Sequence, residues 1–516
     1  MTCQLLIDCL YIILEYLKED KTTLYSCLLV NRLLCGISVR ILWKDISNVG
    51  KFSILYRHTR HSRVEISFFN TLIGCLPDES KEIFRNNEIF ISTPILKPLF
   101  NYAKFCKVLS IPGINKLVDE VLRSILSRDQ HSRLNDKISL IANEIIKMFM
   151  NQASLKTLIC NYNRLDFYGF KPLFSFPCFP GSRNLSVLKC NSNHPSEFFH
   201  QLSQTCRNLQ SILISFENDE VTNELKELIS SQNNLKSLNL RVHSDTSLEN
   251  IIPALTKHTN NLTKLHIYSI RNNNNLPLSF IRLFTNLQEI LLLFVVSHIK
   301  FKDFEKLQYA KFPKLRTLKI SYQCIKFEYL TKFLETNGKN LENIELCREL
   351  LDIDPTMKNV NNDLNLSIAK FCPNLKGINI GINDDEIDTL KMIFVNCQYL
   401  EFIKIFCVKK YLAEMMFEIV ANYSPKNFSK LVFVNSSLTY INPENLESFL
   451  ISWNNRKQKK LLKLNIIKSV FDDEYGTSVE YYYKDNYKLG TNYNQNLKII
   501  EKYENLGVIG FRCGVL

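Results

Sequence analysis

The sequence predicts an α/β solenoid, a stack of short repeats with parallel strands on the concave face and helices on the convex face. A small module of three helices precedes it. Two observations predict this fold: one apolar pattern recurs twelve times along the chain, and a helical spacing of apolar residues, without that pattern, marks the first 46 residues. The composition agrees, because 46% apolar and 22% charged residues are typical of a protein with a packed core.

Residues 1–46 are expected to form the three-helix module. Its first helix is indicated by apolar residues at three- and four-residue steps, namely Leu6, Leu10, Ile13, Leu14 and Leu17. Asp20 is expected to cap the second helix, Gly36 to end it, and a third helix to run over 37–42. A module of about 46 residues buries little apolar surface by itself. We therefore expect it to be stabilised by contacts with a partner or with the rest of the chain.

The order of residues in this module resembles the F-box, the adaptor-binding motif of cullin–RING ubiquitin ligases. The resemblance rests on Leu6-Ile7-Asp8-Cys9-Leu10, Ile13-Leu14, Leu17, Leu24, Leu28 to Arg32, and Ile41-Leu42-Trp43. Two positions depart from the family, because Ile7 stands where a proline is usual and Leu34 where a tryptophan is usual. The alternative interpretation is a helical cap on a larger fold.

The resemblance implies a docking face for a Skp-family adaptor. The implied contact residues are Leu6, Ile7, Leu10, Ile13, Leu14, Leu17, Leu24, Leu28, Val30, Arg32, Leu42 and Trp43. We expect the face to be centred on Leu10, Leu14, Leu17, Leu28 and Val30. Replacing both Leu17 and Leu28 with Asp is then expected to abolish adaptor capture.

The repeat has the form Leu-x-x-Leu-x-Leu, with Ile, Phe or Cys as substitutes. Its units begin at Leu155, Leu185, Leu209, Leu235, Leu262, Leu287, Leu315, Leu341, Leu375, Leu400, Phe428 and Leu461. Starts lie 24 residues apart at the closest (185 to 209) and 34 at the widest (341 to 375), and most spacings fall within the period of about 20–29 residues of leucine-rich repeats, with a few units lengthened. A degenerate unit begins at Cys106. The first, fourth and sixth positions are expected to face the core, and intervening runs such as 221–230 and 327–334 to form helices.

Asparagine directly precedes the first position in eight units. These residues are Asn184, Asn208, Asn234, Asn261, Asn286, Asn340, Asn374 and Asn427. Since Asn tolerates positive φ, we expect it to make the turn from helix to strand. A polar ladder that binds a ligand is the alternative.

The predicted domain organisation has four parts. They are a helical module over 1–46, a packed connector over 47–105 with a helix over 52–61, the solenoid over 106–466, and a capping unit over 467–516 with a helix over 496–505 and a strand over 508–511.

No motif of a nucleotide-binding, hydrolase or metalloprotease site occurs, so we expect neither catalysis nor a cofactor. His58 and His61 lie among arginines and are interpreted as a basic face. The acidic runs 384–386 and 472–474 are interpreted as helix caps, and the alternative for them is a magnesium site. The tyrosine-rich run 481–488 is interpreted as a structural segment, and the alternative for it is a site that stacks on a nucleobase. The 16 cysteines form no CxxC pair, which predicts neither zinc nor disulfides and favours the cytosol or nucleus. No signal peptide or membrane span is expected.

A helical F-box-like module before leucine-rich repeats resembles the substrate receptors of Skp–cullin–F-box ligases. The resemblance implies binding to a Skp-family adaptor and its cullin, and to a target protein held by the solenoid. The alternatives are a leucine-rich-repeat scaffold whose module has lost adaptor binding, and a nucleic-acid-binding solenoid, supported only by the net charge of +13.

The exposed concave positions are the third, fifth and seventh of each unit, because strand side chains alternate. They hold Lys189, Arg241, Lys264, Lys319, Lys404, Lys430 and Lys463 against Glu289 and Glu345. Together with His266 and Tyr268, these cations predict a target with an acidic or phosphorylated segment. The alternative is that lysine only solvates the strands.

Overall fold

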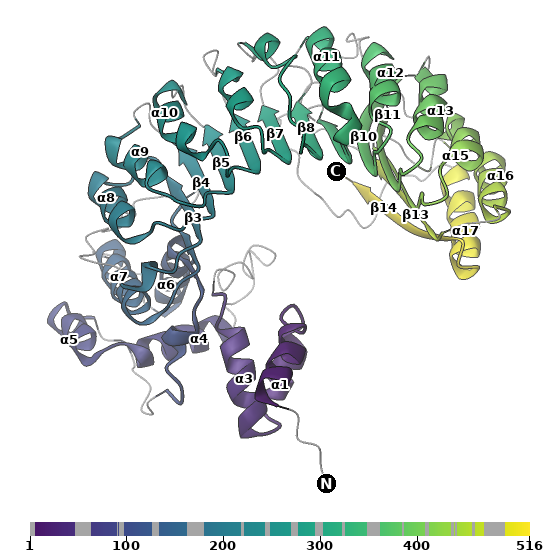
Figure 1. The fold of residues 1–516 in the computed structure, drawn as a ribbon. Coiled ribbons are helices and arrows are strands. Elements are labelled where there is room, and N and C mark those ends of the chain that lie inside the picture. The colour runs from purple at the N-terminus through teal and green to yellow at the C-terminus, as the bar shows by residue number, and fades with distance from the viewer. Residues whose placement is uncertain are drawn as a thin grey trace. The chain divides into compact units, whose positions relative to one another are not determined.

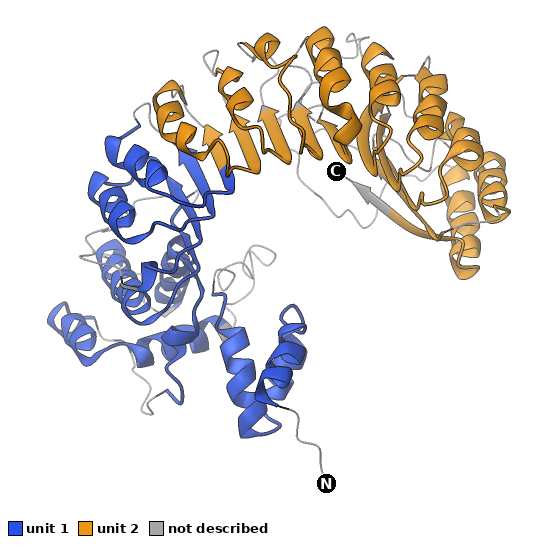
Figure 2. Cartoon of the chain, in the orientation of Figure 1, with its two compact units in different colours: residues 1–238 blue, residues 239–516 orange. Residues whose placement is uncertain are grey.

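The computed structural model describes two compact units, Met1–Leu238 and Asn239–Leu516 (Figure 2). The described residues are 6–46, 63–89, 91, 98–125, 134–162, 180–217, 221–242, 248–269, 277–294, 303–321, 326–347, 362–383, 386–407, 412–434, 438, 441–456, 460–468 and 491–515. The predicted helix over 52–61, the histidine pair within 58–61, and the runs 384–385, 472–474 and 481–488 lie outside them. The division falls inside the predicted solenoid, so the predicted domain boundaries stay predictions.

Both units contain parallel strands that follow one another in chain order, as an α/β leucine-rich-repeat solenoid requires (Figure 1). Unit 1 contains β1 (Val108–Ser110), β2 (Thr157–Ile159), β3 (Val187–Asn191) and β4 (Ser211–Phe216). The division between the units falls within β5 (Ser237–Val242). Unit 2 contains β6 (Lys264–Ser269), β7 (Glu289–Phe294), β8 (Thr317–Ser321), β9 (Asn343–Cys347), β10 (Gly377–Ile382), β11 (Phe402–Cys407), β12 (Lys430–Val434), β13 (Leu462–Lys468) and β14 (Ile509–Val515).

Each predicted repeat coincides with one strand, from β2 to β13, and the degenerate unit at Cys106 forms β1. Strands pair with equivalent positions side by side, as in Leu158 opposite Leu188 and Ile403 opposite Leu431. These side chains are fully buried, which confirms the predicted core positions. Leu461 is the exception: it is 48% exposed, and Leu462 is buried in its place, so the last unit was predicted one residue out of register at its start.

Helices and short 3₁₀ turns cover the side of the strands that carries the core. Those of unit 1 are α6 (Ile111–Ile125), α7 (Leu134–Gln152), α8 (Ser196–Thr205) and α9 (Asn223–Ser230), with a 3₁₀ turn at Pro180–Ser182. Those of unit 2 are α10 (Ile252–Leu255), α11 (Phe327–Asn337), α12 (Asn362–Phe371), α13 (Ile387–Asn396), α14 (Leu412–Met415), α15 (Phe417–Tyr423), α16 (Pro443–Asn454) and α17 (Thr491–Asn505), with 3₁₀ turns at Leu248–Ile251, Thr256–His258, Ser279–Leu283, Phe304–Lys306 and Gly338–Asn340. The face of the strands opposite the helices is called the inner face below. The helix α17 and strand β14 confirm the helix predicted over 496–505 and the strand predicted over 508–511.

The asparagines that precede the repeats act differently from the prediction. Among the described residues, positive φ occurs only at Glu88, Asp303 and Gly507, so none of the predicted asparagine turns uses it. Instead, the side-chain amide reaches the preceding repeat. Asn286 Nδ2 donates to Asn260 O at 2.7 Å, and Asn374 Nδ2 donates to Lys339 O at 2.9 Å. Asn184 and Asn340 make similar bonds, so four of the eight asparagines tie neighbouring repeats together.

The N-terminal module consists of α1 (Ile7–Glu15), α2 (Lys21–Cys27) and α3 (Arg32–Leu42). Asp20 caps α2 by accepting from Thr23 N, as predicted. Asn31 caps α3 by accepting from Leu34 N, so the third helix starts five residues before its predicted start. Gly36 therefore lies inside α3, and the prediction that it ends a helix is wrong.

Replacing Gly36 with Ala is expected to stabilise the module. A Cβ added there would meet no atom within 4 Å, and Ala costs less backbone entropy than Gly inside a helix. The free energy of unfolding should rise by about 0.5–1 kcal/mol. Slower hydrogen exchange of the α3 amides would report the gain, whereas faster exchange would contradict the position of Gly36 inside the helix.

The last residues of the module contact the connector helix α4 (Arg63–Cys75) and the first strand, and the helix α5 (Asp78–Asn86) follows α4 in the connector. Trp43 stacks on Phe68 with ring centroids 4.5 Å apart and lies 4.4 Å from the Tyr102 ring. Lys44 O accepts hydrogen bonds from two backbone amides, those of Lys107 and Val108. The described part of the connector is thus packed, as its composition predicts.

Candidate functional site

The first candidate site is the surface of the N-terminal module. Its exposed residues differ from those that form its core. The core consists of Leu14, Leu24, Ile37 and Ile41, all at most 6% exposed. Around it pack Leu10, Leu17 and Leu42 together with other half-buried apolar residues. The apolar stripe that the sequence shows along the first helix is thus used mainly for the module's own folding.

This burial bears on the predicted adaptor-binding face, whose contacts stay a prediction. Leu14 and Leu24 are at most 5% exposed, so in this structure they belong to the module's core and not to its surface. Trp43 is engaged with Phe68 and Tyr102 and is likewise not a free contact. The helical period identifies an apolar stripe but does not say which of its residues meet the neighbouring helix, so the sequence could not separate the module's core from its exposed residues.

Large apolar side chains nevertheless remain exposed on the module. Of the predicted set, Leu6 is 75%, Ile7 57%, Ile13 50% and Val30 64% exposed. Sequence reasoning missed a second group, which comprises Ile12, Tyr16, Tyr25 and Leu29. Since Ile12, Ile13 and Tyr16 share one side of α1, a second stripe beside the core stripe was the signal that could have found them. We call Leu6, Ile13, Tyr16, Leu29 and Val30 the exposed apolar surface.

The second candidate site is the inner face of the strands in unit 2. Of its predicted cations, Lys264 lies 3.1 Å from Glu289 Oε2, and Lys319 lies 2.6 Å from Glu345 Oε2. His266 Nε2 lies 3.0 Å from the other oxygen of Glu289. The carboxylates therefore offset the positive charge of β6 to β9. This could have been predicted, because in-register stacking places Lys264 beside Glu289.

The remaining predicted cations of the inner face contact aromatic rings or lie apart from these pairs. The Arg241 guanidinium lies 5.5 Å from the Tyr268 ring centroid. Lys404 Nζ lies 5.0 Å from the Phe406 ring, and Lys430 Nζ lies 4.7 Å from the Phe402 ring. Lys189 is half-buried on β3 of unit 1. The structure thus brings Lys264, His266 and Lys319 close to carboxylates, and gathers Lys404 and Lys430 on adjacent strands.

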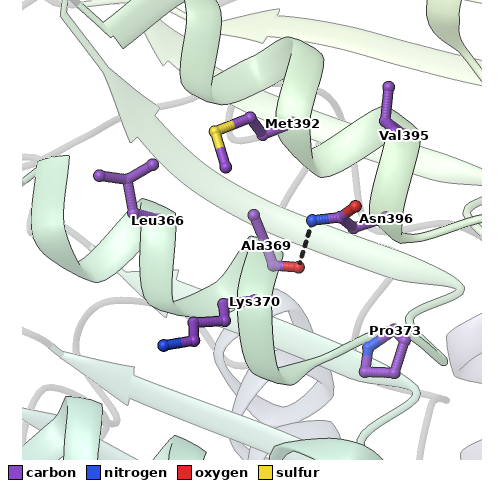
Figure 3. Close-up of a pocket in the computed structure, with 7 residues that line it drawn as sticks. All are labelled: Leu366, Ala369, Lys370, Pro373, Met392, Val395 and Asn396. Carbon is purple, nitrogen blue, oxygen red and sulfur yellow. Dashed lines mark hydrogen bonds between the residues drawn. The ribbon is translucent and has the colours of Figure 1, made fainter.

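A surface hollow of about 620 Å³ lies among the helices of unit 2 (Figure 3). Leu366, Ala369 and Lys370 of α12 and Met392, Val395 and Asn396 of α13 line it, together with Pro373. Asn396 Nδ2 donates to Ala369 O at 3.1 Å across it. Among the described residues that line the hollow, Lys370 is the one ionisable group.

Other titratable groups of the described residues form no reactive cluster. Within the described ranges, no group of three or more His, Cys, Asp or Glu side chains is placed to hold a metal ion. Buried thiols such as Cys190 have pKa values raised to about 12 by burial, so they remain protonated and unreactive at neutral pH. Among the helices that the structure describes, none is long and apolar enough to cross a membrane.

Among the described histidines of unit 1, His194 has the pKa most strongly shifted by its surroundings. Its ring packs near Phe198 and Phe199, and its Nε2 lies 3.2 Å from Cys160 O. Burial lowers the pKa of His194 to about 4, and the hydrogen bond to the Cys160 carbonyl offsets only part of this. The imidazole is therefore a neutral core group at physiological pH.

The buried His194 is expected to make unit 1 less stable in mild acid. Between about pH 6.5 and pH 4 the unfolded chain binds a proton that the folded chain does not, so stability falls as the pH falls through this window. The full loss amounts to about 3 kcal/mol. Hydrogen exchange of the α8 amides at pH 7 and pH 4.5 should show a smaller loss in His194→Gln than in the wild type. Equal losses would contradict a neutral, buried His194.

Comparisons with known proteins find likeness in structure only. No protein-family model matches the chain, and no curated protein matches it. A chain from the crystal structure of the yeast Rad7 and Elc1 complex aligns with a TM-score of 0.38 and 13% identity, covering 70% of this chain and 81% of that one. The leucine-rich-repeat-containing protein LegL7 from Legionella pneumophila aligns with a TM-score of 0.32 and 11% identity, covering 54% of this chain and 83% of that one. Both scores are below 0.5, and the repeat fold rests on the strands and helices described above.

Proposed function

We propose that this protein is the substrate-recognition subunit of a Skp–cullin–F-box ubiquitin ligase. In this proposal the N-terminal module binds the Skp-family adaptor, which links it to the cullin, and the solenoid holds a target protein. The protein contributes no catalytic group. It raises the effective concentration of the target's lysines at a partner's active site, in the cytosol or nucleus.

The observation that carries the proposal is the exposed apolar surface on a module with an F-box-like order of residues. The module has its own core, yet Leu6, Tyr16 and Leu29 remain 75%, 85% and 89% exposed. Exposed apolar residues of this size, where they form a contiguous patch, commonly mark interaction sites. Burying them against an adaptor would yield about 25 cal/mol for each Å² removed from water.

The direct test is complex formation between the purified full-length chain and the purified Skp-family adaptor of the same organism. We expect a stable complex on size-exclusion chromatography. Because apolar contacts carry the binding, raising the salt from about 0.1 M to about 0.5 M should change its affinity little, unlike that of a complex held by exposed charges. Absence of a complex would favour the leucine-rich-repeat scaffold without a ligase role.

A further inference from the structure

The inner face of the last four strands of unit 2 carries four cations, and three of them, Lys430, Lys463 and Arg512, make no ion pair with any described residue. Lys430 of β12 lies opposite Lys463 of β13 in the register of the sheet. Arg512 of β14 lies opposite Asn465, two residues further along β13 from Lys463. Lys463 and Arg512 are exposed, and Lys430 is half-buried. We call Lys404, Lys430, Lys463 and Arg512 the terminal basic patch.

The rest of this face is neutral. The other inner-face positions on β11 to β14 hold only apolar residues, glycine and one asparagine, namely Phe402, Phe406, Val432, Val434, Asn465, Ile467, Gly510 and Gly514. Within the described part of the chain, Lys430, Lys463 and Arg512 make no ion pair. On β6 to β9, by contrast, Glu289 and Glu345 offset the neighbouring lysines. Positive charge without a carboxylate beside it is therefore found on β12 to β14 and not on β6 to β9.

Two phenylalanines position the lysines of this patch. Lys430 Nζ lies 4.7 Å from the Phe402 ring centroid, and Lys404 Nζ lies 5.0 Å from that of Phe406. Such contacts hold the ammonium groups over the rings. A ring face covered by the chain's own ammonium group is a poor platform for stacking a base, so the arrangement favours an anionic group at the ammonium over a nucleobase on the ring.

We propose that the terminal basic patch binds an extended segment of the target protein that carries carboxylate or phosphate groups. The inference rests on the proposed function, because it assumes that the solenoid holds a target. Neighbouring strands lie about 4.8 Å apart, and residues two apart along a strand about 6.6 Å. Acidic side chains at alternate positions of an extended peptide have a similar spacing, so they can meet Lys430, Lys463 and Arg512 together.

The test is fluorescence anisotropy of the full-length chain with three labelled eight-residue peptides. They carry Glu, phosphoserine or Gln at alternate positions in an otherwise identical sequence. We expect the Glu or the phosphoserine peptide to bind and the Gln peptide not to. Whichever anionic peptide binds more tightly identifies the source of the charge. Binding should weaken as salt rises from about 50 mM to about 200 mM, since the contacts are exposed ion pairs.

The decisive variant replaces both Lys463 and Arg512 with Glu. Both side chains are exposed, so the fold should be preserved. We expect binding of the anionic peptides to weaken at least about tenfold. The matched control replaces Lys426 and Lys498 with Glu, which makes the same change in net charge at exposed positions off the inner face, and it should bind within about twofold of the wild type.

Three results would overturn the inference. The Gln peptide could bind as well as the anionic ones, the two double variants could lose binding equally, or a single-stranded oligonucleotide could bind more tightly than either anionic peptide and lose binding in the Lys463→Glu, Arg512→Glu variant. Adaptor capture is measured on the same proteins. If capture persists while peptide binding is absent, only this inference fails; if peptides bind but the adaptor does not, the proposed function fails and the patch stands.

Discussion

Replacing Ile13 with Lys and Leu29 with Asp is expected to abolish capture of the Skp-family adaptor. Both side chains belong to the exposed apolar surface, at 50% and 89% exposure, so neither change opens the core of the module. A charged group at the centre of an apolar interface must lose its water without gaining a partner. Two such positions should weaken binding by at least about 100-fold, or about 3 kcal/mol. Biolayer interferometry with immobilised adaptor measures the change.

The control for this variant introduces the same two charged residues, Lys and Asp, at exposed apolar positions outside the module. Met392→Lys with Val395→Asp alters two apolar residues of α13 that are 44% and 50% exposed, and it also leaves the net charge unchanged. This variant should bind the adaptor as the wild type does. Undiminished capture by the Ile13→Lys, Leu29→Asp protein would remove the module from the interface. The pair Leu17 and Leu28 is less informative, because Leu17 packs against the core and Asp there would also destabilise the module.

Replacing Gly181 with Ala is expected to destabilise unit 1. A Cβ at this position would lie 2.6 Å from two backbone oxygens, those of Ala153 and Met150. Gly181 O also accepts the hydrogen bond from Leu155 N at 3.1 Å that starts the first clear repeat. Because backbone atoms cannot move aside as a flexible side chain can, the free energy of unfolding should fall by about 2–4 kcal/mol.

Hydrogen exchange of the α7 and β2 amides reports this loss locally, which matters because the repeats of a solenoid need not unfold together. The matched control is Gly510→Ala, where the nearest atom to the added Cβ is Leu461 Cδ2 at 3.9 Å. It should leave the exchange of unit 1 unchanged. If Gly181→Ala exchanged as slowly as the wild type, the close approach at the end of α7 would be contradicted.

For much of the candidate site, the sequence predicted which residues lie on the inner face but not which side chains they contact. The sequence pointed to Lys264 and Lys319 as free cations, although each has a carboxylate on the next strand. Each pair joins residues 25 or 26 positions apart (264 to 289, 319 to 345), which become neighbours only because parallel strands stack in register. Arg512 was missed because it lies in the terminal unit, where the repeat pattern no longer marks the inner-face positions.

The sequence by itself determined the repeat architecture, the residues that face its core and the cap of the second helix by Asp20. These features are local: alternation along one strand, or a side chain three residues from its partner, is visible within a single segment. Only the tertiary structure decided which apolar stripe of α1 is buried, what Trp43 contacts and which cations keep their charge unopposed. Burial and ion pairing are set by neighbours distant in sequence, and a periodic pattern reports the direction of a side chain without reporting what lies there.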